Sequence, residues 1–393
     1  MSTVNPPSRP QQIRTFLEQN KLRAWLAWRP DELVMLTGYL PAWGVSVLIY
    51  FANAEPLLFI PLLEPKDHLP QGVRVRTYPW GDTKCADPYS ILLAAVADEL
   101  KKSRIEPHEV GMNLSSARST MPINSAENPP EDFASLFLQL ASGGNAQSRA
   151  GFAALYLRKT SKEVDCIRLA NKVANIGLRA FFDNLQPGVS EAEVAAAVES
   201  AIHRQIGHDG VFYSRGWAMV QSGPNSAEGG QFNRSTGRRL QNGDLVLIEL
   251  ATCANGYWSD LTRTEAVGTP PSDAAELLAL VRNAQRAAVD GVGPGVEAGY
   301  VDSLARNKIA AQGFDKYFTH HTGHHVGFRY HDPGFLIFPN EPSRLEPGMI
   351  VTIEPGAYIP ERGYGARMED NVLVTESGHE VLSHLPETAN DRD

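Results

Sequence analysis

The chain has 393 residues, of which 42% are hydrophobic and 21% charged, the composition of a globular protein with a large buried core. The formal net charge of −9 and the lack of any Lys/Arg run argue against a broad nucleic-acid-binding surface. The longest apolar runs, such as Val45 to Phe51, are of strand length and too short to cross a bilayer. We therefore expect neither nucleic acid nor membrane as a partner.

The cysteines and the N-terminus bear on the compartment. Cys85, Cys166 and Cys253 are odd in number and far apart, and they match neither a disulfide nor a metal-binding pattern. The opening residues, MSTVNPPSRPQQ, lack the charged and then apolar order of a signal peptide. A cytoplasmic protein is the expectation.

Residues 1–155 predict a small α/β domain. Short helices are expected at Ile13 to Asn20 and at Ile91 to Lys101, where apolar residues recur at helical spacing. Strands are expected at Leu22 to Trp28, Val45 to Phe51, Pro56 to Pro61 and Val110 to Leu114. Strands that alternate with helices are typical of an α/β layer.

Residues 156–393 begin with two expected helices. The first extends to about Phe182, with Ser161 as its candidate N-cap. The second follows Ser190, which forms a capping box with Glu193. Further helices are expected at Pro271 to Val289 and Val301 to Gln312, and strands at Ala218 to Ser222, Leu245 to Thr252, Ser259 to Val267 and Met349 to Ile353, before a last hairpin made of Gly365 to Thr375 and its return strand.

Five of the eleven histidines fall in one stretch, THHTGHHVGFRYHDP at residues 319–333. Within it, His324 has a glycine before it at Gly323, and His320 and His331 flank it. Neutral imidazole is the commonest side-chain ligand of transition metals, and a glycine lets the backbone approach a bound group closely. The stretch indicates a metal site; the alternative is a polar loop with surface histidines.

Four carboxylates accompany His324 on or beside expected strands: Glu249, Asp260, Glu354 and Glu369. An acid in an apolar strand is costly to bury unless a cation or hydrogen bonds compensate it. For one acid alone, a cap or a salt bridge is an equal alternative. Four carboxylates and one imidazole suit a pair of divalent ions such as Mn, Co, Zn or Fe. Ions about 3.5–4 Å apart can activate water and clamp the attacking and leaving atoms.

Long segments resemble the creatinase/prolidase/aminopeptidase P group of hydrolases, which have the pita-bread fold. The segments are GDLVLIELATCANGYWSDLTRT, HHTGHHVGFRYHDPG, LEPGMIVTIEPGAY and GARMEDNVLVTESG. LVMLTGYLP, at Leu33 to Pro41, resembles the smaller N-terminal domain of these proteins. The resemblance implies a creatinase-like α/β domain at residues 1–155, a pita-bread catalytic domain at 156–393, and a homodimer.

The resemblance also implies roles for single residues. Metal ligands are expected at Glu249, Asp260, His324, Glu354 and Glu369. His320 and His331 fall on the two family histidines that contact the substrate. Glu354 also falls on the proposed general base, and Tyr358 on a tyrosine near the metals. Arg367 falls on an arginine that can fork onto the ligating carboxylates and orient them.

Two positions depart from the family pattern. Glu249 stands where the family has aspartate, and its extra methylene lengthens the reach of the carboxylate by about 1.5 Å. Gly230, in SGPNSAEGGQFN, stands where the proline-cleaving members have a histidine. Loss of a donor to the tetrahedral intermediate typically costs about 10²–10³ in rate.

These patterns predict an enzyme of the Xaa-Pro dipeptidase or aminopeptidase type that cleaves a peptide or amide C–N bond with two metal ions. A creatinase-like or ectoine-hydrolase-like C–N hydrolase, or a lyase on a small osmolyte, is the alternative, with one ion or none because of Glu249. A non-catalytic binding module is the third. The sequence identifies neither the substrate nor the metal.

Overall fold

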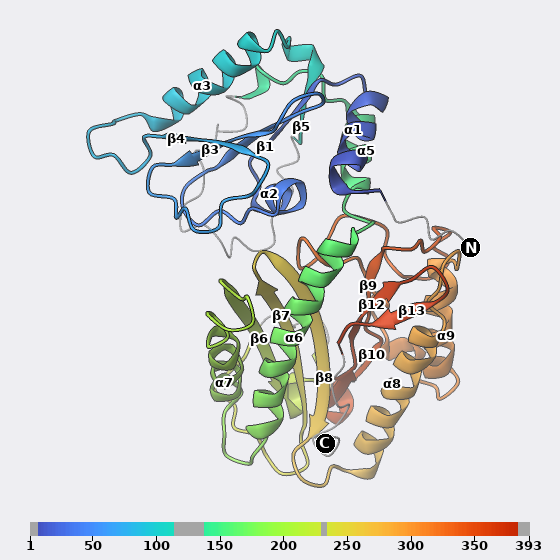
Figure 1. Cartoon of the computed structure of the whole chain (residues 1–393). Helices are drawn as coiled ribbons and strands as arrows, with labels where there is room; N and C mark the ends of the chain where they lie inside the picture. The colour runs from blue at the N-terminus through green and yellow to red at the C-terminus, as the bar shows by residue number, and fades with distance from the viewer. Residues whose placement is uncertain (1–6, 114–136, 229–233, 384–393) are drawn as a thin grey trace. The chain divides into compact units, whose positions relative to one another are not determined.

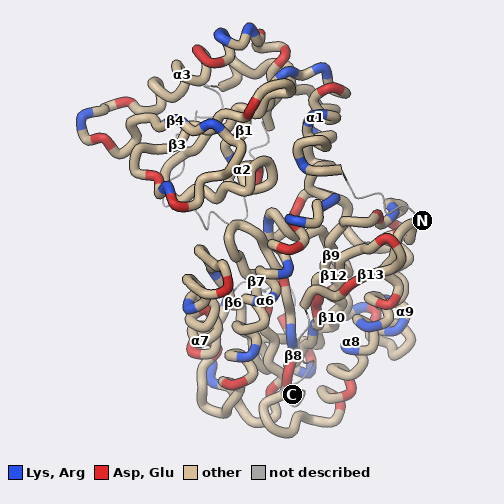
Figure 2. Tube along the Cα trace, viewed as in Figure 1, with Lys and Arg blue, Asp and Glu red and all other residues tan. Residues whose placement is uncertain are grey.

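The computed structural model describes residues 7–113, 137–228 and 234–383 (Figure 1). Leu114 and Gly230 lie outside these ranges. The chain divides into two compact units, Met1–Tyr156 and Leu157–Asp393. Acidic and basic residues are interspersed along the trace of each unit (Figure 2). Among the described residues, none of the helices has both the length and the apolar character that a membrane span requires.

The first unit is a mixed five-stranded sheet with the strand order β4-β3-β2-β1-β5. Its strands are β1 Ala24–Ala27, β2 Val47–Phe51, β3 Leu57–Pro61, β4 Arg74–Tyr78 and β5 Val110–Met112, and its helices are α1 Arg9–Gln19, α2 Pro30–Thr37, α3 Pro88–Lys102 and α5 Ala146–Ala154. The sequence did not predict β4, because this edge strand reads RVRTY and is largely exposed. Charged residues on an edge strand hide the apolar pattern and discourage pairing with other chains.

Helices α6 (Ser161–Asp183) and α7 (Glu191–His203) open the second unit. Thr160, and not the expected Ser161, is the N-cap of α6: the backbone N–H of Thr160 donates to the Glu163 carboxylate at 2.7 Å. The cap lies one residue earlier because Glu163 then occupies the third helical position, where it can reach back. The capping box before α7 is confirmed.

An antiparallel sheet, β6 (Ser214–Ser222), β7 (Leu245–Ala254) and β8 (Tyr257–Ala266), packs against these helices (Figure 1). Asn255 and Gly256 form the two-residue turn between β7 and β8, both with positive φ, as this kind of hairpin requires. The turn sets a register in which Glu249 pairs with Thr262 and Ala251 with Asp260. Glu249 and Asp260 are therefore diagonal neighbours on one face of the sheet.

The second half of this unit repeats the arrangement with other elements. They are helices α8 (Ser272–Asp290) and α9 (Ala298–Ala310) and strands β9 (Ile350–Ile353), β10 (Gly356–Ile359), β11 (Tyr364–Arg367), β12 (Asp370–Val374) and β13 (His379–Val381). The hairpin expected from Gly365 to Thr375 and its return is confirmed in part: β12 pairs with its return strand β13, but residues 365–375 form two strands, and β11 pairs with β10 instead. Strands β11 and β12 are separate because the backbone N–H of Glu369, which lies between them, donates to the carbonyl of Thr262 in β8 at 3.0 Å.

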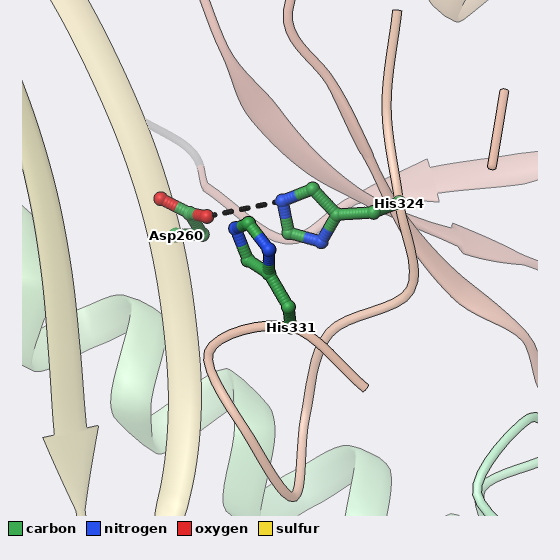
Figure 3. A group of neighbouring side chains, drawn as sticks. All are labelled: Asp260, His324 and His331. Atoms are coloured by element: carbon green, nitrogen blue, oxygen red, sulfur yellow. Dashed lines mark ion pairs between the residues drawn. The ribbon is translucent and has the colours of Figure 1, made fainter. Parts of the chain in front are cut away.

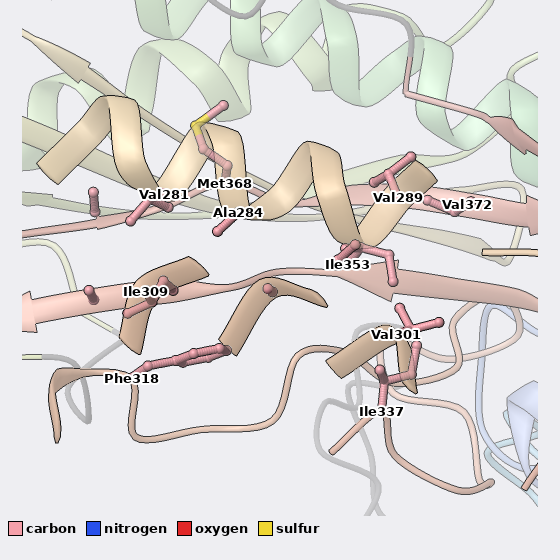
Figure 4. Close-up of a cluster of buried hydrophobic side chains, with 14 of the residues drawn as sticks. Val281, Ala284, Val289, Val301, Ile309, Phe318, Ile337, Ile353, Met368 and Val372 are labelled. Carbon is pink, nitrogen blue, oxygen red and sulfur yellow. The ribbon is translucent and has the colours of Figure 1, made fainter. Parts of the chain in front are cut away.

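Two separate apolar cores support the two halves. One lies between α6, α7 and the β6–β8 sheet. The other packs α8 and α9 on β9 to β12, and includes Val281, Val301, Ile309 and Ile353 (Figure 4). Each fully buried aliphatic side chain of this kind contributes about 1.5–3 kcal/mol. The strands that lie between the two halves carry polar side chains, and an apolar core packs on each side of them.

Candidate metal centre

Hydrogen bonds to Thr352 of strand β9 position His324. Its backbone N–H donates to the hydroxyl of Thr352 at 3.1 Å, and the N–H of Thr352 donates to its carbonyl at 2.8 Å. Only glycine fits at Gly323, where a Cβ would lie 1.9 Å from the Thr352 carbonyl oxygen. Nδ1 of His324 lies 3.0 Å from the carbonyl oxygen of His325, so Nδ1 carries the proton and Nε2 offers its lone pair.

Two carboxylates face that lone pair, Asp260 from strand β8 and Glu354 from the position directly after β9. Nε2 of His324 lies 3.3 Å from Oδ2 of Asp260 and 3.6 Å from Oε1 of Glu354. The ring of His331 lies over that of His324, with 3.8 Å between their centroids, and points to the same place from its own turn (Figure 3). Donor atoms of Asp260, His324 and His331 lie within 4.8 Å of one another, and so do those of His321, His324 and Glu354.

The donor set fits a divalent cation. Oδ1 of Asp260 and Oε1 of Glu369 are buried and have no hydrogen-bond partner among the described residues. Burial and the neighbouring carboxylates raise the pKa of Asp260, and burial raises the pKa of Glu354 and that of Glu369 to about 8. Buried acids that repel one another need a compensating positive charge. A divalent ion among these oxygens would supply it.

Glu249 has different neighbours. One carboxylate oxygen accepts from the hydroxyl of Tyr330 and the other from the guanidinium group of Arg367. Neither donor group within 4.8 Å contains Glu249. Arg367 is fully buried and also donates to Tyr358 at 2.8 Å and to Thr262 at 3.0 Å. Glu249 lies beside the centre, but its charge is balanced by an arginine.

His320 does not face the carboxylates. Its Nδ1 lies 2.7 Å from the carbonyl oxygen of His321, so Nδ1 donates and Nε2 accepts from the hydroxyl of Tyr358 at 2.9 Å. Burial lowers the pKa of His320 to about 4, which keeps the ring neutral. Arg367, Tyr358 and His320 thus form a hydrogen-bonded series along one side of the centre.

Comparison with known proteins identifies the family. The model of metallopeptidase family M24 matches residues 165–376, more than half of the chain. The chain belongs to metallopeptidase family M24. The expected resemblance to the creatinase, prolidase and aminopeptidase P group is thereby confirmed.

Solved structures extend the likeness of this M24 metallopeptidase to the whole chain. The prolidase from Pyrococcus furiosus has a TM-score of 0.74 and 27% identity, covering 95% of this chain and 99% of its own. The dipeptidase PepE from Mycobacterium ulcerans has a TM-score of 0.71 and 30% identity, covering 97% of this chain and 96% of its own. The predicted pita-bread fold is confirmed.

Among sequence relatives, a Xaa-Pro dipeptidase of Pyrococcus furiosus is 37% identical over 229 residues, which are 58% of this chain. The match spans 64% of that relative, so the M24 chain covers less than two thirds of the length of this curated relative. An M24 metallopeptidase depends on a divalent metal, and the donors described above are candidates to bind it.

Two histidines of the stretch 319–333, His321 and His325, received no role from the sequence, and their surroundings differ. His321 is about one-third exposed and lies 3.4 Å from Glu354. His325 is fully buried, with its ring edge-on to Phe335. Tyr330, in the same stretch, was also missed, although it contacts Glu249. The density of histidines could have suggested His321, but no pattern in the sequence indicates which side chains turn inward.

Proposed function

We propose that this chain is a metal-dependent hydrolase that cleaves the C–N bond before proline in dipeptides or short peptides. The observation that carries the proposal is a group of buried carboxylates: Asp260 and Glu354 face Nε2 of His324, and Asp260 and Glu369 each have one buried oxygen without a hydrogen-bond partner among the described residues. The Xaa-Pro dipeptidase of Pyrococcus furiosus among the relatives supports the substrate class. Asp260, Glu354 and Glu369 are the proposed carboxylate ligands.

The residues around the centre can have separate roles in the reaction. A divalent ion bound there supplies Lewis acidity, which polarises the amide carbonyl and activates water. Glu354, with a pKa raised to about 8 in the metal-free protein, accepts a proton and passes it to the leaving nitrogen. His331 is exposed at the edge of the centre, where it can contact the substrate. Tyr358 orients the neutral ring of His320, and Arg367 orients Tyr358.

One observation favours a second candidate. Both carboxylate oxygens of Glu249, one of the five expected metal ligands, accept hydrogen bonds, one from Tyr330 and the other from Arg367. A creatinase-like or ectoine-hydrolase-like enzyme that acts on a small osmolyte with one ion or none would fit an altered centre of this kind. The predicted pair of ions remains the expectation for the peptidase, with Mn, Co, Zn or Fe as the candidate metals.

A turnover screen separates the two candidates. Purified protein, stripped of metal and then supplied with Mn²⁺, Zn²⁺, Co²⁺ or Fe²⁺, is incubated with Ala-Pro, Gly-Pro, longer Xaa-Pro peptides, creatine and ectoine. Cleavage of the proline peptides, abolished by chelator, supports the peptidase. Turnover of creatine or ectoine alone would move the function to the second candidate. Light scattering on the same samples tests the proposed homodimer.

A further inference from the structure

Helix α9 carries an ion pair, Asp302 and Arg306, to which the proposed reaction gives no role. Nε and Nη2 of Arg306 each donate to one carboxylate oxygen of Asp302, both at 2.9 Å. The aspartate side chain is buried, whereas that of the arginine is 24% exposed. Val301, Ala305 and Ile309 of the same helix lie in the apolar core, so the pair stands on a fixed support.

Arg306 also binds the backbone where the stretch 319–333 begins. Nη1 donates to the carbonyl of Phe318 and Nη2 to that of His320, both at 3.1 Å. The guanidinium carbon lies 4.1 Å from the centroid of the Phe318 ring, and that ring meets the ring of His320 edge to face, with 5.2 Å between centroids. Residues 318–322 belong to no helix or strand, so the guanidinium group satisfies carbonyls that a neighbouring strand would otherwise bind.

The carboxylate of Asp302 is connected to Glu354 through Thr322. The hydroxyl of Thr322, a fully buried residue, donates to Oδ1 of Asp302 at 2.7 Å. The carbonyl of Thr322 accepts the backbone N–H of Glu354, also at 2.7 Å. Short hydrogen bonds therefore link helix α9 to the residue whose carboxylate faces Nε2 of His324. A buried group that loses its partner in such a series is costly, so the contacts hold one another in place.

We propose that Asp302 and Arg306 act together as positioning residues: Arg306 holds His320, and Asp302 holds Glu354 through Thr322. Burial is the main cause of the low pKa of His320, to which Arg306 and Asp302 make smaller contributions of opposite sign. The pair therefore acts by geometry more than by charge. Geometry matters because a displacement of about 1 Å at a reacting centre can cost about 10²-fold in rate. The part that concerns His320 rests on the proposed function, and the part that concerns Glu354 rests only on metal binding.

Steady-state kinetics on Ala-Pro at saturating Mn²⁺ test the role of Arg306. Arg306→Lys keeps the positive charge but cannot bind the carboxylate and two carbonyls at once. We expect kcat to fall about 10²-fold, with KM and Zn²⁺ affinity close to wild type. Arg344→Lys is the matched control, because Arg344 also donates to a carbonyl, that of Gly295, and to a carboxylate, that of Glu297 next to the same helix. Its kcat should equal that of wild type.

Calorimetric titration of the metal-free protein with Zn²⁺ tests the role of Asp302 without any substrate. Asp302→Ala removes the acceptor of the Thr322 hydroxyl and should weaken Zn²⁺ affinity about 10–100-fold, the range found for residues that support metal ligands. Asp302→Asn keeps an oxygen at the same place and should bind Zn²⁺ much more tightly than Asp302→Ala. If Asp302→Ala unfolds, Thr322→Val removes the same hydrogen bond from the other side, with circular dichroism to check the fold.

The two measurements fail separately. Wild-type kcat in Arg306→Lys would overturn the positioning of His320. Wild-type Zn²⁺ affinity in Asp302→Ala, or in Thr322→Val where that variant replaces it, would overturn the positioning of Glu354. If the wild-type protein cleaves no proline peptide, the proposed function fails, and the Zn²⁺ titration still decides the role of Asp302.

Discussion

Lys159 and Asp332 form a fully buried ion pair, with Nζ of the lysine 3.0 Å from Oδ2 of the aspartate. The other oxygen of Asp332 accepts the backbone N–H of Arg329 at 2.8 Å. The carboxylate therefore holds together the turn that carries His331 to the metal centre. Lys159 is in turn anchored by its backbone N–H, which donates to Gly348 at 2.8 Å.

Removing the lysine charge should destabilise the protein strongly. Lys159→Met keeps most of the apolar volume but leaves a buried carboxylate without its cation, a change that typically costs about 3–5 kcal/mol. The free energy of unfolding in urea, measured on metal-free protein, checks this value. The double variant Lys159→Met/Asp332→Asn should recover part of the loss, because no uncompensated charge remains. Strictly additive losses would mean that the pair does not act as a unit.

The hairpin of β7 and β8 shows how much of the fold the sequence can predict. An apolar run, a turn expected at Gly256 and Tyr257 and a return strand define local structure, and the register follows from the turn, which the structure places at Asn255 and Gly256. The pairing of β11 with β10 could not be predicted, because Gly365 to Thr375 looks like one continuous arm of a hairpin. What interrupts it is a contact of Glu369 with β8, more than one hundred residues away in the chain. Local patterns do not contain such contacts.

The candidate site, like the fold, could be predicted from the sequence only in part. Asp260 and His324 could be named from ordered motifs, and the structure brings them within 3.3 Å. The environment of Glu249 could not be named, since Tyr330 and Arg367 lie 81 and 118 residues further along the chain. The sequence indicated a costly buried acid but could not indicate whether a metal or an arginine compensates it.

His325 offers a test of stability that should leave the centre intact. Its ring is fully buried, 4.6 Å from that of Phe335, and both ring nitrogens lack partners among the described residues. An unsatisfied buried polar group costs about 1–3 kcal/mol. His325→Leu, of similar volume, should raise the free energy of unfolding by about 1 kcal/mol. His325→Asn, which keeps polarity but loses volume, should lower it; a loss in the leucine variant would indicate a hidden polar partner.

The metal-free protein should lose stability as the pH rises through the range set by Glu354. Burial raises the pKa of this group from 4.5 to about 8. Between these values the unfolded chain is ionised while the folded chain keeps its proton, so the stabilising contribution present below pH 4.5 is lost towards pH 8. Thermal melts in EDTA from pH 5 to pH 8 should show a flatter dependence for Glu354→Gln. Equal slopes for the two proteins would show that Glu354 is not protonated there.

His331→Ala should separate substrate contact from metal binding. The side chain is exposed, and its ring lies against that of His324. Turnover should fall about 10²-fold or more, as expected when a group that assists proton transfer or positions the substrate is removed. Metal content by elemental analysis should stay at the wild-type value, whereas His324→Ala should lose it. Loss of metal from His331→Ala would make His331 a ligand.

Glu249→Asp restores the residue that the family has at this position. The shorter side chain reaches about 1.5 Å less far, which should weaken its contacts with Arg367 and Tyr330 and expose a carboxylate beside Asp260. We expect the number of ions per chain, measured by elemental analysis after equilibration with excess Mn²⁺, to equal or exceed that of wild type. Glu249→Ala is the control: if Arg367 and not a metal balances Glu249, this variant keeps the metal content of wild type. If Glu249 is itself a ligand, as the sequence predicts, Glu249→Ala will lose metal instead.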